Sequence, residues 1–197
     1  MESLCKSSKT IILYDDERSN QQWISDGIGI YLLDGLPPID PDIALTLFDV
    51  AEDKRGKFHT AQEMLPRDVF NDSYFGEREI YPTMMHLEWA GENMVPFVWN
   101  DGIEFVRNEH FNPLGPVQQI SFHLRDTPEG RFIAIKSGMF LVAMIRCAFV
   151  PTEDFAKVLM RIAVSTDRKM KQPMVDKIMD QMMIDRDTGE VLEDEED

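Results

Sequence analysis

The chain has 197 residues, 43% of them hydrophobic, and a formal net charge of −16. This length and apolar content predict a globular protein of one domain or two very small ones, and no apolar run approaches the roughly 20 residues that a membrane span needs. The acidic balance disfavours nucleic acid and favours a partner with a basic surface. Cys5 and Cys147 suggest no disulfide framework, so we expect a cytoplasmic protein without membrane contact.

In chain order, residues 1–9 are predicted to be a loose terminus and residues 9–14 a strand. A first hairpin follows at residues 22–33. A short helix then begins at Asp40 or Asp42, where Pro41 suits the first turn. Its apolar face is expected to contain Ile43, Ala44, Leu47 and Val50.

One pattern recurs three times: apolar residues, a turn with a central glycine, and apolar residues again. The copies are residues 23–31, 99–106 and 135–142, with Gly27, Gly102 and Gly138 in their turns. Glycine adopts the positive φ that tight hairpin turns need. The pattern predicts a sheet built from hairpins.

Residues 52–116 predict short strands and loops with several aromatic residues to bury, and residues 117–124 alternate like a half-buried strand. The third hairpin spans residues 131–150. A helix from residue 151 should bury Phe155, Val158, Leu159 and Ile162 on one face, and a last helix is expected at residues 172–184. We predict an α+β fold: a mainly antiparallel, hairpin-built sheet with two or three packed helices in residues 1–184, and a disordered acidic tail at 185–197.

The C-terminal region supplies the candidate partner-binding residues. Acidic side chains crowd the tail, and methionines, whose flexible thioethers suit variable partners, line the last helix. These residues are Glu190, Glu193, Asp194, Glu195, Glu196, Asp197, Met179, Met182 and Met183. They favour a non-catalytic protein-interaction factor, in its sharper form an acidic inhibitor that occupies a basic nucleic-acid groove of its partner.

One basic stretch offers the alternative of direct nucleic-acid binding. Its candidate residues are Lys157, Arg161, Arg168, Lys169 and Lys171. They could contact phosphates, although the stretch has no aromatic side chain for base stacking. The repeated hairpin–helix units at residues 23–50 and 132–163 are similar to sliding-clamp domains, which implies a DNA-associated scaffold acting as an oligomer. The first unit departs from that pattern because its helix region is acidic.

A metal-dependent nuclease is the third hypothesis. Pro41 and Asp42, followed by Glu52 and Lys54, spell a PD…ExK signature, in which carboxylates hold a divalent metal. The residues between them predict a helix, whereas that chemistry needs a strand hairpin. Asp15, Asp16 and Glu17 form an acidic corner that could hold a cation together with Asp26, but a solvated turn is the favoured interpretation. We therefore expect no enzyme activity, no catalytic residue, no metal and no cofactor.

Overall fold

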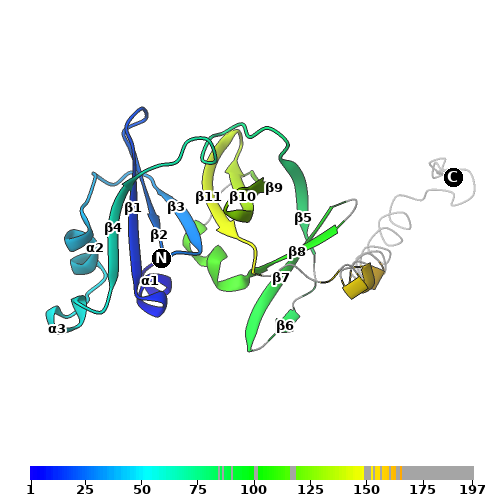
Figure 1. Cartoon of the computed structure of the whole chain (residues 1–197), viewed down its shortest axis with the longest axis horizontal. Helices are drawn as coiled ribbons and strands as arrows, with labels where there is room; N and C mark the ends of the chain where they lie inside the picture. Colours follow the sequence, from blue (N-terminus) through cyan, green and yellow to red (C-terminus); the bar gives the residue numbers. More distant parts are fainter. Residues whose placement is uncertain are drawn as a thin grey trace, which may run out of the picture.

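The computed structural model describes residues 1–83, 85, 87–89, 91–99, 102–115, 119–148, 152, 154, 155, 157–159, 161, 162 and 165. Eleven strands form one sheet, in the order β4-β1-β2-β3-β11-β10-β9-β5-β7-β6, with β8 paired to β7 (Figure 1). The strand bounds are β1 Thr10–Asp16, β2 Gln21–Ser25, β3 Gly29–Leu33, β4 His59–Met64, β5 Arg78–Pro82, β6 Leu87–Trp89, β7 Glu92–Trp99, β8 Gly102–Arg107, β9 Ile120–Thr127, β10 Gly130–Ser137 and β11 Phe140–Arg146. Among these strands the β1–β4 pair is parallel and the others are antiparallel. The predicted α+β class is confirmed.

The three predicted hairpins are present as β2–β3, β7–β8 and β10–β11. Gly27 and Gly138 have φ of 92° and 61°, as their turns require. Gly102 differs from these two glycines in both conformation and role. Its φ is not positive, and a Cβ there would lie 2.3 Å from the Trp99 ring. The glycine at 102 is thus required by close packing against a cross-strand aromatic side chain.

Helices are short and lie beside the sheet: α1 Glu2–Ser8, α2 Pro41–Leu47, α3 Glu52–Arg55 and the 3-10 helix η1 Asn108–Leu114. The predicted loose N-terminus was wrong, because Leu4 and Cys5 on α1 are buried in the main core. Helix α2 is confirmed, and the Asp40 side chain accepts a hydrogen bond from the Ile43 N–H at its start.

The predicted apolar face of α2 was only half right. Ala44 is buried as expected, with Leu45 beside it, whereas Ile43 and Leu47 are exposed. Val50 is buried but lies beyond the end of α2, so its position does not define the face of the helix. Because α2 has seven residues, its two central apolar side chains suffice to hold it on the sheet.

A helix was predicted to begin at residue 151. The described residues between 154 and 165 are helical, in agreement with that prediction. Of its expected apolar face, Phe155 contacts Trp89 and Leu159 packs near Met94, but Val158 and Ile162 are exposed. The helix predicted at 172–184 and the tail at 185–197 lie outside the described residues.

Apolar side chains alternate between the two faces of the central strands. In β10, Ile133 and Ile135 join the larger core cluster, which α1, α2 and η1 cover, while Phe132 and Ala134 join a second cluster on the other face. The segment at residues 65–77 connects β4 to β5 and runs across the top of Figure 1; we call it the crossing segment. It contributes Phe70 to the second cluster. Central strands therefore carry continuous apolar runs.

The aromatic residues of the middle region divide between core and surface. Phe70 and Phe97 are buried as expected, but Phe75 is fully exposed and Tyr81 and Trp89 are about half exposed. Phe75 lies in the crossing segment, and the other two lie on β5 and β6 near one end of the sheet. Of these two strands, β6 is the end strand and has a neighbour on one side only, whereas β5 is paired on both sides, so composition alone overstated the core in this region.

Gly102→Ala should lower the free energy of unfolding by about 1–3 kcal/mol, because the added methyl group must displace the Trp99 ring. Gly56→Ala is the matched control: Gly56 has φ of −64° and nothing within 4 Å of an added Cβ. We expect it to change stability by less than about 0.5 kcal/mol. Urea denaturation of both variants tests this, and equal effects would contradict the packing role of Gly102.

Candidate functional site

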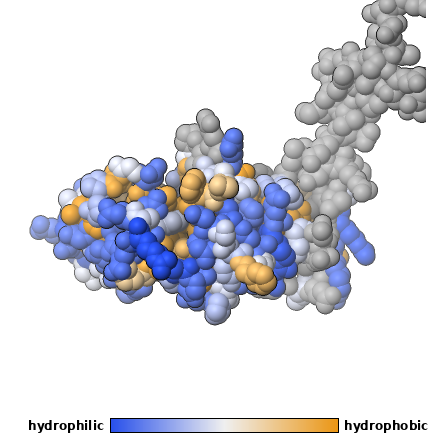
Figure 2. All heavy atoms as spheres, turned by 90° about the horizontal axis from the view of Figure 1, so that it is seen from above, coloured by the Kyte–Doolittle hydropathy of each residue, from blue (hydrophilic) through white to orange (hydrophobic). Residues whose placement is uncertain are grey.

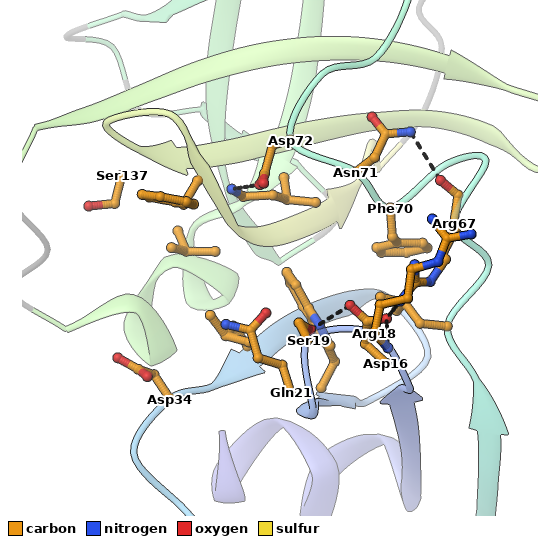
Figure 3. A pocket seen from close by; sticks show the side chains of 16 residues that line it. Asp16, Arg18, Ser19, Gln21, Asp34, Arg67, Phe70, Asn71, Asp72 and Ser137 are labelled. Atoms are coloured by element: carbon orange, nitrogen blue, oxygen red, sulfur yellow. Dashed lines mark hydrogen bonds and ion pairs between the residues drawn. The ribbon is translucent and has the colours of Figure 1, made fainter.

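A cleft opens where the two halves of the sheet meet. Strands β3 and β11 are paired over three positions, with Tyr31 opposite Ala143 and Gly29 opposite Ile145 at the ends of the ladder. Beyond Tyr31 and Ala143 the strands are no longer paired, and a cavity of about 610 Å³ lies there. We call this cavity the junction cleft. Its walls come from the β1–β2 turn, β3, the crossing segment and the β10–β11 hairpin (Figure 3).

The crossing segment forms one wall of the junction cleft and is fixed at several points. Phe70 packs edge-on against Trp23, with ring centroids 6.3 Å apart. The Asp72 carboxylate accepts a 2.8 Å hydrogen bond from the Leu141 N–H, which ties the segment to the β10–β11 hairpin. Figure 3 shows Phe70, Asn71 and Asp72 on this wall, with Gln21 from the β1–β2 side across the cavity.

Three residues that line the cleft each have a buried side-chain atom with no hydrogen-bond partner among the described residues. They are Trp23 through its indole Nε1, Asn71 through Oδ1, and Arg67 through Nη2, although Arg67 forms an ion pair with Asp16. Trp23 is 4% exposed. The Asn71 amide nitrogen donates 3.0 Å to the Arg67 carbonyl, which fixes the orientation of the amide. Buried polar atoms are normally paired, so an unpaired donor and acceptor in one cavity point to a ligand or water.

Charged and apolar residues border the opening. Asp16 forms an ion pair with Arg67 and so neutralises it, which leaves Asp34, Asp72 and Arg18 as the other charged residues that line the cavity. Phe140 is 66% exposed, although it also lines the cavity. Figure 2, viewed from above, shows hydrophobic residues between hydrophilic ones on this side of the molecule. The cleft thus combines an apolar wall with a weakly acidic rim.

A second cavity of about 330 Å³ adjoins the first. It shares Leu32, Asp34, Ser137 and Val142 with the junction cleft and extends toward Leu114 of η1. The two cavities therefore border the same gap between β3 and the β10–β11 hairpin. Ser137 is the last residue of β10 and directly precedes Gly138 in the turn of that hairpin.

A buried ionic network anchors the crossing segment below the cleft. Arg125, fully buried, donates to the Val69 and Asn71 carbonyls at 2.8 Å each and pairs with Glu77 at 2.9 Å. Lys136 pairs with the other carboxylate oxygen of Glu77. Burial alone would raise the pKa of Glu77, but the hydrogen bonds and charges of Lys136 and Arg125 outweigh it and lower this pKa.

Ser121, His123 and Glu77 follow the order of a hydrolytic triad but lack its geometry. Ser121 Oγ lies 3.0 Å from His123 Nε2, but His123 Nδ1 is 3.8 Å from Glu77 Oε1, which Lys136 already occupies. Burial, and then Lys136, lower the pKa of His123. A triad acid must hold the imidazolium that forms during catalysis. Here Lys136 pairs with the Glu77 oxygen that lies nearest His123, so this oxygen is not free to hold an imidazolium. The cluster therefore supports the fold rather than nucleophilic attack.

A second buried polar group connects β3 to η1. The Tyr31 hydroxyl donates 2.9 Å to the His110 carbonyl, and His110 Nδ1 lies 3.9 Å from an Asp26 carboxylate oxygen. Asp26 itself accepts from the Ile28 and Gly29 N–H groups in the β2–β3 turn. Burial lowers the pKa of His110, against the opposing charge of Asp26. This group closes the turn and ties η1 to the sheet.

The acidic corner predicted as a solvated turn is instead engaged with neighbouring side chains. Asp15 accepts hydrogen bonds from Gln22 and Gln62, and Asp16 pairs with Arg67. Asp26 lies at the opposite end of β2 and is buried. Among the residues that the structure describes, no group of three or more His, Cys, Asp or Glu side chains could hold a metal ion.

The nuclease residues are not arranged on a strand hairpin. Asp42 lies on α2, and Glu52 and Lys54 lie on α3. Of the predicted nucleic-acid-binding residues, Lys157 and Arg161 are exposed on a helical segment, and Arg168, Lys169 and Lys171 lie outside the described residues. The predicted partner-binding residues also lie outside: Met179, Met182, Met183, Glu190, Glu193, Asp194, Glu195, Glu196 and Asp197.

Sequence reasoning missed the junction cleft. It placed Trp23 in a hairpin and expected the aromatic residues of 52–116, Phe70 among them, to be buried, but it gave no role to Asn71, Asp72 or Phe140. The polar run at residues 71–73 between apolar segments reads as an ordinary loop. Only the pairing of β3 with β11, more than a hundred residues apart in sequence, brings these side chains together.

Comparison with known proteins yields no relative: no family model, no curated protein and no solved structure matches the chain. Among the described residues, no helix is long and apolar enough to cross a membrane.

Glu77→Gln should lower the free energy of unfolding by about 3 kcal/mol, because it removes the carboxylate charge from buried Arg125. Because the pKa of Glu77 is lowered in the folded state, its stabilisation is present above the ordinary carboxyl pKa and is lost as the pH falls through the folded value. The variant should therefore lose less stability than wild type on acidification. Urea unfolding at several pH values measures both effects.

Glu63→Gln on β4 is the matched control for that experiment. Glu63 is exposed and makes no ion pair with the described residues, so its loss should cost less than about 0.5 kcal/mol. Equal stability losses in the two variants, or an unchanged acid dependence in Glu77→Gln, would show that the Glu77 network does not anchor the fold.

Proposed function

We propose that this protein is a non-catalytic interaction factor that binds a segment of a partner protein in the junction cleft. The observation that carries the proposal is that two residues lining one cavity have unpaired buried polar atoms, the N–H of Trp23 and the side-chain oxygen of Asn71. A peptide backbone supplies both the carbonyl acceptor and the N–H donor that these atoms lack. The same backbone carries side chains that would contact the apolar wall.

The chemistry of the rim favours a segment with an apolar and a basic residue. Phe140, which is 66% exposed, offers an apolar contact beside the opening. Asp34 is exposed and forms no hydrogen bond or ion pair with the described residues, so it is free to meet a cation. The net charge of −16 would add long-range attraction for a basic partner, which raises the association rate more than the affinity.

The alternatives gain less support. A clamp-like scaffold needs a basic surface toward DNA, whereas Asp40, Asp42, Glu52 and Asp53 are exposed around α2 and α3. A nuclease needs its carboxylates on adjacent strands, and here they lie on two separate helices. An inhibitor that fills a basic groove remains compatible with the proposal, because its acidic tail would act in addition to the cleft.

Site-specific photo-crosslinking tests the proposal. A benzoylphenylalanine in place of Phe140 should capture a partner protein in lysate of the native cell, and capture should survive nuclease treatment. The same replacement of Phe75 is the control, because Phe75 is fully exposed and does not line the cleft. Adducts of equal yield at both positions, or nucleic acid at position 140, would contradict the proposal.

Trp23→Phe then tests the hydrogen bond in the identified complex. The variant keeps an aromatic ring against Phe70 but removes the N–H, so we expect affinity to fall about 2–10-fold. Gln21→Ala at the same cavity serves as a contact-only control, since Gln21 is exposed and its side chain has no bonded partner among the described residues. Unchanged affinity in Trp23→Phe would place the partner elsewhere.

A further inference from the structure

A cavity lined by four lysines lies at the end of the molecule opposite the helical segment near residue 160. It has a volume of about 400 Å³, and its walls come from α1, α3, the residue after α1, the connection between α2 and α3, and the residues after α3. The lining residues are Lys6, Lys9, Asp49, Val50, Ala51, Lys54, Lys57 and Phe58. Figure 1 shows α1 and α3 at the same end of the molecule. We call this cavity the lysine pocket.

Local structure brings these lysines together. Lys6 lies in the last turn of α1, and Lys9 caps that helix with a left-handed φ of 54°. Lys54 lies in α3, and the Lys57 N–H donates 3.0 Å to its carbonyl. Residues three apart around a helical turn share one side. Two pairs of lysines from distant parts of the sequence therefore meet at one cavity.

The positive charge of the lysine pocket is largely unpaired. Lys6 pairs with Glu2 at 2.7 Å, but Lys9, Lys54 and Lys57 form no ion pair with the described residues, and Asp49 is the one acidic residue among those that line the pocket. In a chain with only 20 basic residues against 36 acidic ones, such a grouping is unusual. It would attract an anionic ligand.

A second cationic cavity shows the contrast. Arg107, Arg131 and Arg146 line a cavity of about 440 Å³, but each already has an acidic or carbonyl partner. Arg131 pairs with Glu104 and Asp126, Arg146 donates to the Glu129 carbonyl, and Arg107 lies 3.9 Å from Glu92. The lysine pocket, where three of four cations lack such an acceptor, is the stronger anion site.

We propose that the lysine pocket binds the acidic C-terminal segment of the same chain, residues 190–197. That segment, EVLEDEED, has six acids in eight residues, so its charge is complementary to the pocket. Val191 and Leu192 match the apolar side chains of Val50 and Phe58 that line the pocket. The proposal is independent of the junction cleft, because the two cavities share no residue.

Tethering makes weak contacts sufficient. The 24 residues at 166–189, which precede the acidic segment, can span roughly 80 Å when extended, at about 3.3 Å per residue. A segment linked in this way has an effective concentration of up to the order of millimolar at the pocket. Exposed lysine–carboxylate pairs contribute little each and are screened by salt, so binding should depend on several pairs and should weaken in 0.5 M NaCl, where the Debye length is only about 4 Å.

Zero-length carbodiimide crosslinking of the full chain, read by peptide mass spectrometry, tests the proposal. We expect Lys54 and Lys57 to be joined to carboxylates of residues 190–197 in a concentration-independent yield that falls at least fivefold in 0.5 M NaCl. The double variant Lys54→Glu/Lys57→Glu should show at least fivefold less crosslinking of the segment to Lys6 and Lys9. All four lysines are exposed, so an unchanged melting temperature verifies the fold.

Lys169→Glu/Lys171→Glu is the matched control, with the same change of net charge in the other basic stretch. It should leave the crosslink yield at the lysine pocket within twofold of wild type. Crosslinks that map mainly to Lys157, Lys169 or Lys171 would overturn the proposal. A crosslink yield that rises with protein concentration would also overturn it, because it indicates binding between two copies of the chain. So would pocket lysines that inorganic phosphate protects from reaction but that are never joined to the segment.

Discussion

The structure depends on the three-residue pairing of β3 with β11. This short ladder joins β4-β1-β2-β3 to the strands from β11 to β6, and without it the molecule would contain two separate sheets. Its backbone bonds are reinforced by the Arg146 N–H, which donates 3.0 Å to the Ile28 carbonyl, and by the hydrogen bond from Tyr31 to η1. Because the ladder ends at the Tyr31–Ala143 pair, and Leu32 and Val142 beyond it are unpaired with each other, the same junction also leaves the space that becomes the cleft.

The buried ionic groups explain how an open junction stays ordered. A ladder of three residue pairs is short, so the crossing segment must be held on its own account. Arg125 performs this task through two backbone carbonyls of the segment and through Glu77 at its end. A buried arginine whose acceptors are fixed carbonyls specifies one position for the segment, since any displacement leaves a charge unsolvated. The wall that carries Phe70 and Asn71 is therefore preorganised.

Local sequence signals predicted the hairpins, the α2 cap and the fold class, because each depends on neighbours in the chain. Gly27 and Gly138 occupy turns whose backbone requires them, and Asp40 caps the helix that it precedes. The prediction failed where distant contacts decide the outcome. The polar N-terminus is helical because Leu4 and Cys5 pack in the main core. The cleft arises from the pairing of β3 with β11, which the hydrophobic periodicity of the sequence does not predict.

The positions of the charges carry information that the net charge does not. The composition shows an acidic chain, and composition alone predicts that each lysine is a solvated surface residue. In the structure, the arginines are mostly paired with acids or carbonyls, whereas Lys9, Lys54 and Lys57 gather at one cavity without such partners. A basic site on an acidic protein repels basic partners locally and attracts acidic segments. If the acidic segment of the chain occupies it, a partner with a basic surface must compete for that segment, whereas the junction cleft stays accessible. The two cavities would then recognise opposite features of their ligands, one by apolar and backbone contacts and the other by charge.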